Sequence, residues 1–343
     1  MKQEYYFQQM RKEQKVAYRA MYDGFTALSG EFAVPRLSGE ELSEICFWLR
    51  LDHPSIFYVC GFSYRFTEQS DSVDLIPNYL FEKKKIKEHQ KALEGRIARI
   101  LRPLRNLKPE EQELAIHEFI QENVTYDKLK KQYSHEIIGP LQQGVGVCEG
   151  IAKTVKILCD ELGIDCMIAV SEADPPHGIK YRHAWNVLKI NGSWYHLDAT
   201  FDNSLGRYGT KRYDYFNLDD KRIFRDHRPV ICPIPACGKS DNFYYKVNRL
   251  SLTKVEDVEK RMKAVLRKKL PCFVFHWRGG ALNREILGEM LEGAARAAQE
   301  KGKYIRLSLN YPQAVIQLTI LDDIPETEIC QEEANEGELS AES

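Results

Sequence analysis

The dipeptide Asn191-Gly192 constrains the fold more than any other feature of this sequence, because it separates two strand-like runs. Asn-Gly is the strongest short signal for a two-residue β-hairpin turn. The predicted cross-strand partners are Lys189 and Trp194, Val187 and His196, Trp185 and Asp198, and His183 and Thr200. Alternate side chains of a strand share a face, so one face of this hairpin would carry His183, Trp185, His196 and Asp198.

In this register His183 and Asp198 are diagonal neighbours, about 7–8 Å apart at the backbone, so their side chains can meet. A carboxylate in that position orients an imidazole and stabilises its charge. A slip of one residue would place the two on opposite faces. Taken alone, an ordinary strand histidine beside a turn carboxylate is the simpler interpretation. His196 shares the face and is an alternative base, but it lacks an equally placed acid.

A cysteine among three glycines adds a third group. The stretch GVGVCEG places Cys148 at the start of a predicted helix, 148–162, which ends at Gly163. Unpaired N–H groups and the macrodipole at a helix N-terminus favour a thiolate, and the flanking glycines permit tight turns and close approach of a substrate. A cysteine, a histidine and an aspartate in this order suit acyl transfer through a thioester. The alternative is one more buried thiol in a chain with nine cysteines.

Two segments, GVGVCEGIAKTVKILCDELGI and RHAWNVLKINGSWYHLDATFDN, resemble the transglutaminase-like superfamily, also called the transglutaminase/cysteine-protease-like fold, and its bacterial members in particular. The similarity extends over about 40–227. It implies that Cys148 is the nucleophile, His183 the general base and acid, and Asp198 the orienting carboxylate. Ile151 departs from the pattern, since many such sequences have an aromatic residue there, and this leaves the shape of the adjacent pocket open.

The resemblance implies an α+β fold, a transglutaminase-like (papain-like) core in which the helix that starts at the cysteine packs on an antiparallel sheet. The capping-box sequence Ser38-Gly39-Glu40-Glu41 predicts a helix before this core, and helical and strand-like segments alternate over 252–321. The predicted divisions are a mostly helical N-terminal region 1–107, a catalytic core 108–245, a small C-terminal α/β domain 250–321 and an acidic disordered tail 322–343.

Charge and cysteine usage limit the partners and the compartment. The net charge is −1, although nine acidic residues lie in the last 23 positions and leave 49 basic and 41 acidic residues elsewhere. This balance predicts neither nucleic-acid nor membrane binding. The N-terminus lacks the apolar stretch of a secretory signal, no apolar run approaches the roughly 18 residues of a membrane span, and the cysteines have no framework spacing. We therefore expect a cytoplasmic protein that binds neither nucleic acid nor membrane. The resemblance implies a bacterial protein with a peptide or protein substrate, and the partner of the C-terminal domain stays open.

An oxyanion site needs two donors. The backbone N–H of Cys148 is the first candidate. Gln142 lies six residues upstream, a spacing like that of papain-like proteases, in which a glutamine side chain is the second donor; Gln143 and Tyr126 are alternatives. Trp185 and Trp194 are candidates for a substrate groove, although aromatic residues in a sheet more often pack internally.

No metal or other cofactor is expected. The residues His227, Cys232 and Cys237 lack the spacing of a standard zinc site, and no EF-hand loop is present in the sequence. The cysteine, histidine and aspartate together predict a cysteine enzyme acting on peptide or amide bonds. Hydrolysis is the preferred reaction, since water as acceptor needs no second binding site. The alternatives are a transamidase of the protein-glutamine crosslinking type and a non-catalytic binding module on the same fold.

Overall fold

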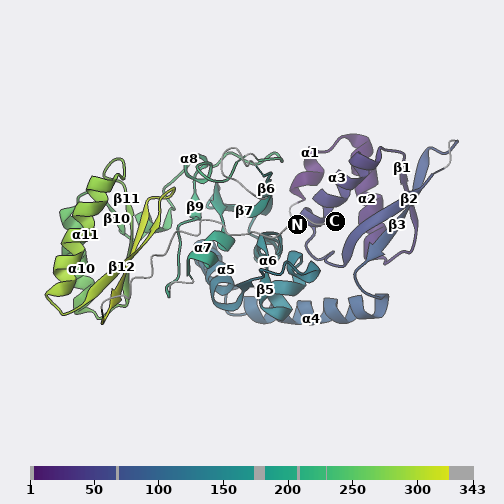
Figure 1. The fold of residues 1–343 in the computed structure, drawn as a ribbon. Coiled ribbons are helices and arrows are strands. Elements are labelled where there is room, and N and C mark those ends of the chain that lie inside the picture. Colours follow the sequence, from purple (N-terminus) through teal and green to yellow (C-terminus); the bar gives the residue numbers. More distant parts are fainter. Residues whose placement is uncertain (1–3, 67–68, 174–181, 207–208, 229, 324–343) are drawn as a thin grey trace, which may run out of the picture. The chain divides into compact units, whose positions relative to one another are not determined.

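The computed structural model describes residues 4–66, 69–173, 182–206, 209–228 and 230–323. The chain divides into two compact units, Met1–Val247 and Asn248–Ser343, each of which is described by itself (Figure 1). The acidic tail was predicted to be disordered, and its residues from 324 onward lie outside the described ranges. Within the described ranges no helix combines the length and the apolar character needed to cross a bilayer.

The first unit begins with helices and a small sheet. Its helices are α1 (Tyr5–Gln9), α2 (Lys12–Thr26), α3 (Gly39–Asp52) and α4 (Lys83–Leu101). The Ser38 side chain accepts from Glu41 N–H and the Glu41 carboxylate accepts from Ser38 N–H, so the predicted capping box is present. The strands are β1 (Phe32–Pro35), β2 (Val59–Arg65) and β3 (Ser72–Tyr79), arranged antiparallel in the order β1-β3-β2.

The core of this unit packs helices against a four-stranded antiparallel sheet of order β6-β7-β8-β9. The strands are β6 (Cys166–Ser171), β7 (His183–Ile190), β8 (Ser193–Leu197) and β9 (Phe216–Leu218). The helices are α5 (Pro109–Asn123), α6 (Cys148–Leu162), α7 (Ala199–Gly206), α8 (Asp220–Ile223) and α9 (Tyr244–Val247). Between α5 and α6 lie β4 (Thr125–Tyr126), the 3₁₀ helix η1 (Gln132–His135), the π-helix η2 (Gly139–Gln143) and β5 (Val145–Gly146). Helix α6 packs on β6 and β7, so an antiparallel sheet supports the helix that starts at Cys148.

The hairpin between β7 and β8 has the expected turn. Asn191 and Gly192 both adopt positive φ, +50° and +81°, as a type I′ turn requires. The predicted register is observed from the pair Ile190–Ser193 at the turn to the pair Asn186–Leu197 at the other end. The last two predicted pairs, Trp185 with Asp198 and His183 with Thr200, are wrong. The strand ends at Leu197 and α7 begins at Ala199, while His183 pairs with Ser171 of β6.

The glycines around Cys148 serve the packing of the protein itself. Gly144 has a φ of +66° and forms the turn after η2. A Cβ on Gly146 would lie 2.8 Å from Pro140, and one on Gly150 would lie 2.2 Å from the carbonyl oxygen of Ser134. The expectation that these glycines provide room for a substrate therefore applies to neither Gly146 nor Gly150, because protein atoms already fill that space.

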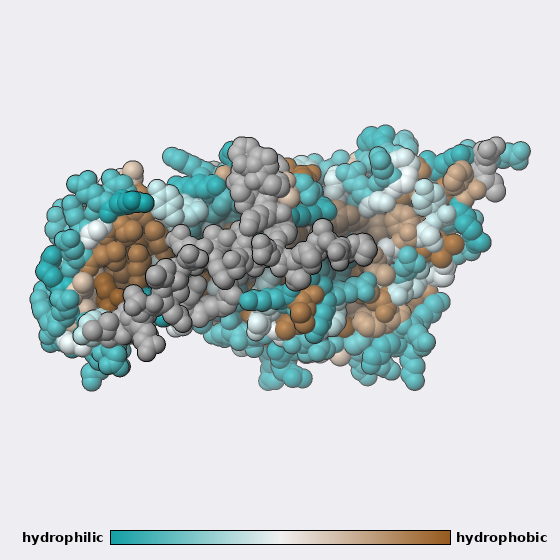
Figure 2. Space-filling model, viewed as in Figure 1, coloured by the Kyte–Doolittle hydropathy of each residue, from teal (hydrophilic) through white to brown (hydrophobic). Residues whose placement is uncertain are grey.

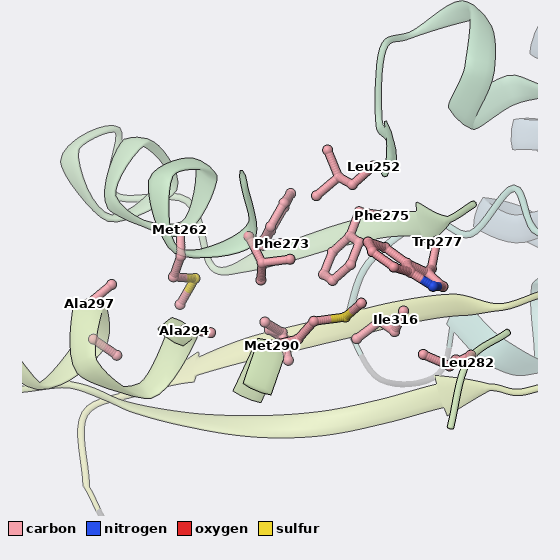
Figure 3. Packing of buried hydrophobic residues seen from close by; sticks show 13 residues of the cluster. Leu252, Met262, Phe273, Phe275, Trp277, Leu282, Met290, Ala294, Ala297 and Ile316 are labelled. Carbon is pink, nitrogen blue, oxygen red and sulfur yellow. The ribbon is translucent and has the colours of Figure 1, made fainter. Parts of the chain in front are cut away.

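The second unit has two helices on one mixed sheet. Its elements are β10 (Ser251–Leu252), α10 (Glu256–Arg267), β11 (Cys272–Trp277), α11 (Arg284–Gln299), β12 (Tyr304–Asn310) and β13 (Val315–Leu321). The sheet order is β10-β11-β13-β12, with β10 and β11 parallel and the other pairs antiparallel. Aromatic residues of β11 pack against Met262, Met290 and Ile316 (Figure 3). Hydrophobic colour is also visible on the surface of this unit in Figure 2, and its half-buried apolar side chains include Ile305 and Leu307.

Candidate active site

Cys148 is the first residue of α6. The preceding residue, Val147, is extended and acts as N-cap without a side-chain hydrogen bond, and the Cys148 side chain is partly exposed. Backbone N–H groups in the first turn of a helix have no carbonyl partner within that helix. The thiol therefore lies beside donors that can bind a negative atom.

His183 is the first residue of β7 and lies against this thiol. Its Nε2 donates to Asp198 Oδ2 over 2.7 Å, which leaves Nδ1 as the nitrogen that can interact with Cys148. Burial alone would lower the pKa of His183, but the charge of Asp198, its hydrogen bond and the interaction with Cys148 together raise that pKa to about 10. The arrangement favours a protonated imidazole beside the sulfur.

Asp198 is held by hydrogen bonds on both oxygens. It is 1% exposed, and its Oδ1 accepts from the N–H groups of Thr200 (2.8 Å) and Phe201 (3.2 Å), so it caps α7. Burial opposes ionisation, yet His183 and His227 hold the pKa of Asp198 well below its usual range. Asp198 therefore reaches His183 from a helix cap that directly follows β8, and not from within a strand.

A second histidine meets the same carboxylate. His227 Nε2 lies 2.9 Å from Asp198 Oδ2. Sequence reasoning weighed His227 only as a zinc ligand with Cys232 and Cys237, and these three do not gather. Cys232 contacts the Tyr6 hydroxyl at 3.2 Å, and Cys237 lies beside Asp220. His227 follows Asp198 by 29 positions in an irregular segment, and no pattern in the sequence would have identified its partner.

The alternative base, His196, is engaged elsewhere. Its Nδ1 accepts from the indole N–H of Trp185 at 3.0 Å and its Nε2 bonds Asp220 at 2.9 Å, so neither nitrogen is available to a thiol. Trp185 is only 1% exposed and its ring stacks beside His183, so it packs within the protein and does not line an open groove. Trp194 pairs with Lys189, which lies six residues along β7 from His183. Six strand residues span about 20 Å, so the backbone of Trp194 lies far from His183.

Two groups are candidates for the second oxyanion donor. Gln142 Oε1 accepts a hydrogen bond from His89 Nδ1 at 3.0 Å, while the buried Nε2 of Gln142 has no partner among the described residues. Burial, followed by the charges of Cys148 and Asp198, raises the pKa of Tyr126 to about 12. The two candidates thus differ: the Gln142 amide has a donor without a partner among the described residues, and the pKa of the Tyr126 hydroxyl responds to the charge at Cys148.

Two clusters bring three ligand-type atoms within 4.8 Å of one another among the described residues. They are His183 with Asp198 and His227, and His196 with Asp220 and Cys237. In the second cluster an indole N–H can only donate, so His196 Nδ1 carries no proton and Nε2–H donates to Asp220. A metal on Nε2 would leave this imidazole without any N–H, and metal-bound histidines almost always keep and donate the other one. The hydrogen bonds therefore favour a proton over a metal.

A family model and several solved structures match parts of this chain. Residues 98–199, which include Cys148, His183 and Asp198, match the model of the transglutaminase-like superfamily. A crystal structure of a TGase aligns over 41% of this chain and 44% of its own, with 10% identity and a TM-score of 0.29. A proposed cysteine protease from Cytophaga hutchinsonii aligns over 42% and 66% (15% identity, TM-score 0.28), and a proposed protease from Parabacteroides distasonis over 41% and 36% (12%, 0.25).

The aligned part thus spans less than two thirds of each of these three structures. No curated protein matches the sequence significantly. The family match, by contrast, coincides with the elements that carry the thiol, the imidazole and the carboxylate. Residues 98–199 of this chain are a transglutaminase-like superfamily domain.

Proposed function

We propose that the protein is a cysteine-dependent acyl-transfer enzyme that acts on peptide or amide bonds through a thioester at Cys148. One observation carries the proposal: His183 interacts with the Cys148 thiol on one side and donates to Asp198 over 2.7 Å on the other. A nucleophile, a base and an orienting acid in contact are the requirements of this chemistry.

Each step of the reaction has a group to perform it. Cys148 Sγ attacks the carbonyl carbon, and the oxygen becomes an oxyanion beside the N–H groups at the start of α6. As the C–N bond breaks, the proton on His183 Nδ1 passes to the leaving amine. Water then attacks the thioester, its proton goes to Nδ1, the C–S bond breaks and the thiolate returns. Asp198 stays ionised throughout and holds the ring in place.

A cavity of about 480 Å³ is a suitable entrance for the substrate. It is lined in part by Tyr126, whose pKa responds to the charge at Cys148, and by Asn203, Glu122 and Lys211. These polar walls fit a hydrated peptide segment better than an apolar side chain. Hydrolysis is the preferred outcome because water needs no additional site. Transfer to an amine would need a second nucleophile to enter by the same route.

Alkylation by iodoacetamide tests the nucleophile, and Cys60 is an internal control because it is exposed whereas Cys148 is only partly so. At pH 6 an unperturbed thiol is about 0.3% thiolate, so exposure alone would favour Cys60. We expect peptide mass spectrometry to show that Cys148 is modified before Cys60. In His183→Ala the rate of Cys148 modification should fall, while the rate of Cys60 modification should not change. Preferential modification of Cys60, with Cys148 insensitive to the variant, would exclude the proposal.

A panel of peptides then separates the two reaction types. Glutamine-containing peptides with and without a primary amine are incubated with the protein, and products are identified by mass. We expect the wild type to release free acid in both mixtures and Cys148→Ala to release none. An amine adduct as the main product would identify a transamidase instead.

A further inference from the structure

The acid of the proposed site is shared by two histidines. Asp198 Oδ2 accepts from His183 Nε2 at 2.7 Å and from His227 Nε2 at 2.9 Å. In a simple triad the carboxylate has one imidazole partner. His227 is the last residue of the stretch over which the sequence resembles the family, but the resemblance assigns it no role in the site.

Both nitrogens of His227 face carboxylates. Nδ1 lies 2.6 Å from Asp226 Oδ1, and the other oxygen of Asp226 accepts from the Tyr215 hydroxyl at 2.6 Å. Ionised carboxylates only accept hydrogen bonds, so an imidazole that bonds one on each side carries a proton on each nitrogen. This geometry makes His227 an imidazolium cation.

The surroundings of His227 keep its imidazole protonated. The side chain is 1% exposed, and its ring packs against Trp185, Phe201 and Tyr215. Burial lowers its pKa, but the hydrogen bonds and charges of Asp198 and Asp226 outweigh burial and raise the pKa above the ordinary value. The titratable groups that face it are Asp198, Asp226, His183, Tyr215 and His196.

We propose that His227 is a positioning residue of the same site, a permanent cation that fixes Asp198 Oδ2 toward His183 and limits how tightly His183 holds its proton. The inference rests on the proposed function. The two imidazole rings are 5.2 Å apart, so a charge on one disfavours a charge on the other. A general acid that must release its proton to a leaving amine works best with a pKa near the working pH. Asp198 raises the pKa of His183, and a positive charge on His227 opposes that rise.

The first experiment needs no substitution in the measured protein. Histidine side chains are labelled with ¹⁵N and observed by NMR from pH 5 to 9, with His227→Gln used only to assign the signal. We expect His227 to keep protons on both nitrogens through at least pH 8. A neutral His227 at pH 7 overturns the inference whatever the reactivity of Cys148. A cationic His227 beside an unreactive Cys148 would instead overturn the proposed function.

The second experiment separates charge from shape. The rate of Cys148 alkylation is measured against pH for His227→Gln, which loses the cation, and for His227→Lys, which keeps it. Loss of a positive charge should move the alkaline inflection, which reports His183, to higher pH by about one unit. The lysine variant should stay near the wild type. A uniformly lower rate without a shift, or the same shift in both variants, overturns the inference.

Discussion

Asn186 Nδ2 donates to the backbone carbonyl of Ala152 at 2.9 Å, and this bond ties the strand that begins at His183 to the helix that begins at Cys148. Asn186 is 1% exposed, and its amide also lies 3.5 Å from Met167 O on the neighbouring strand. The fourth residue of the His-Ala-Trp-Asn motif is thus a structural link between the two elements that carry the base and the thiol.

Replacing Asn186 by leucine should weaken that link. We expect the free energy of unfolding to fall by about 1–3 kcal/mol, because a buried hydrogen bond is lost, and Cys148 alkylation at pH 6 to slow. Urea unfolding and alkylation rates measure the two effects. Asn123→Ala is the control, since Asn123 Nδ2 bonds Phe119 O of its own helix on the exposed surface. Equal effects of the two substitutions would contradict this role.

The stability of the protein should depend on pH through His183 and Asp198 with opposite signs. The pKa of His183 is raised from 6.5 to about 10, so its contribution is complete below pH 6.5 and is lost as the pH rises toward 10. The pKa of Asp198 is lowered from 3.8, so its contribution is present above that value and is lost at lower pH.

Urea unfolding of His183→Gln and Asp198→Asn against the wild type tests these signs. We expect the penalty of His183→Gln to be largest near pH 6 and to shrink as the pH approaches 10. The penalty of Asp198→Asn should shrink as the pH falls below 3.8. A penalty that does not change with pH for either variant would show that the charge of that side chain makes no net contribution.

Two reactions of Cys148 distinguish Gln142 from Tyr126 as the second oxyanion donor. Acylation passes through an oxyanion, whereas alkylation does not. An activated ester is used to acylate Cys148, and iodoacetamide to alkylate it. Loss of a true oxyanion donor should slow acylation by about 10²–10³-fold and leave alkylation unchanged. We expect this result for Gln142→Ala, whose Nε2 is a buried donor without a partner among the described residues.

Tyr126→Phe is the matched variant. If it shows the selective loss of acylation and Gln142→Ala does not, the Tyr126 hydroxyl is the donor. Equal slowing of acylation and alkylation by either substitution would indicate a distorted site, and that variant would not have removed an oxyanion donor.

The hairpin shows what local sequence rules can and cannot place. Turn chemistry predicted the register of β7 and β8 through Asn186 and Leu197. The same rule continued the strand past its end, because nothing in strand periodicity shows that Asp198 leaves the sheet to cap α7. The Asp198 and His183 side chains still meet, since a cap directly after β8 points back toward the first residue of β7.

His227 lay beyond sequence reasoning for a different reason. Its partners, Asp198 and Asp226, are set by an irregular segment whose path depends on tertiary packing and not on periodicity. The strand β3 was likewise not predicted, although the sequence SVDLIPNY alternates between buried and more exposed positions. The burial of Trp185 depends in part on its contact with His227, which lies outside the hairpin and which the hairpin alone does not reveal.

Gly150, two residues after the thiol, should not tolerate a side chain. A Cβ there would lie 2.2 Å from the Ser134 carbonyl oxygen, which also accepts from the N–H of Val147 at 3.0 Å. Gly150→Ala must therefore displace η1 or the start of α6, and we expect a loss of about 3 kcal/mol in unfolding free energy together with slower alkylation of Cys148. Gly95→Ala on α4, where the new Cβ meets nothing within 4 Å, should instead stabilise the protein by about 0.5–1 kcal/mol. Equal unfolding free energies and equal rates of Cys148 alkylation in Gly150→Ala and Gly95→Ala would show that the close packing of η1 on α6 does not position the thiol.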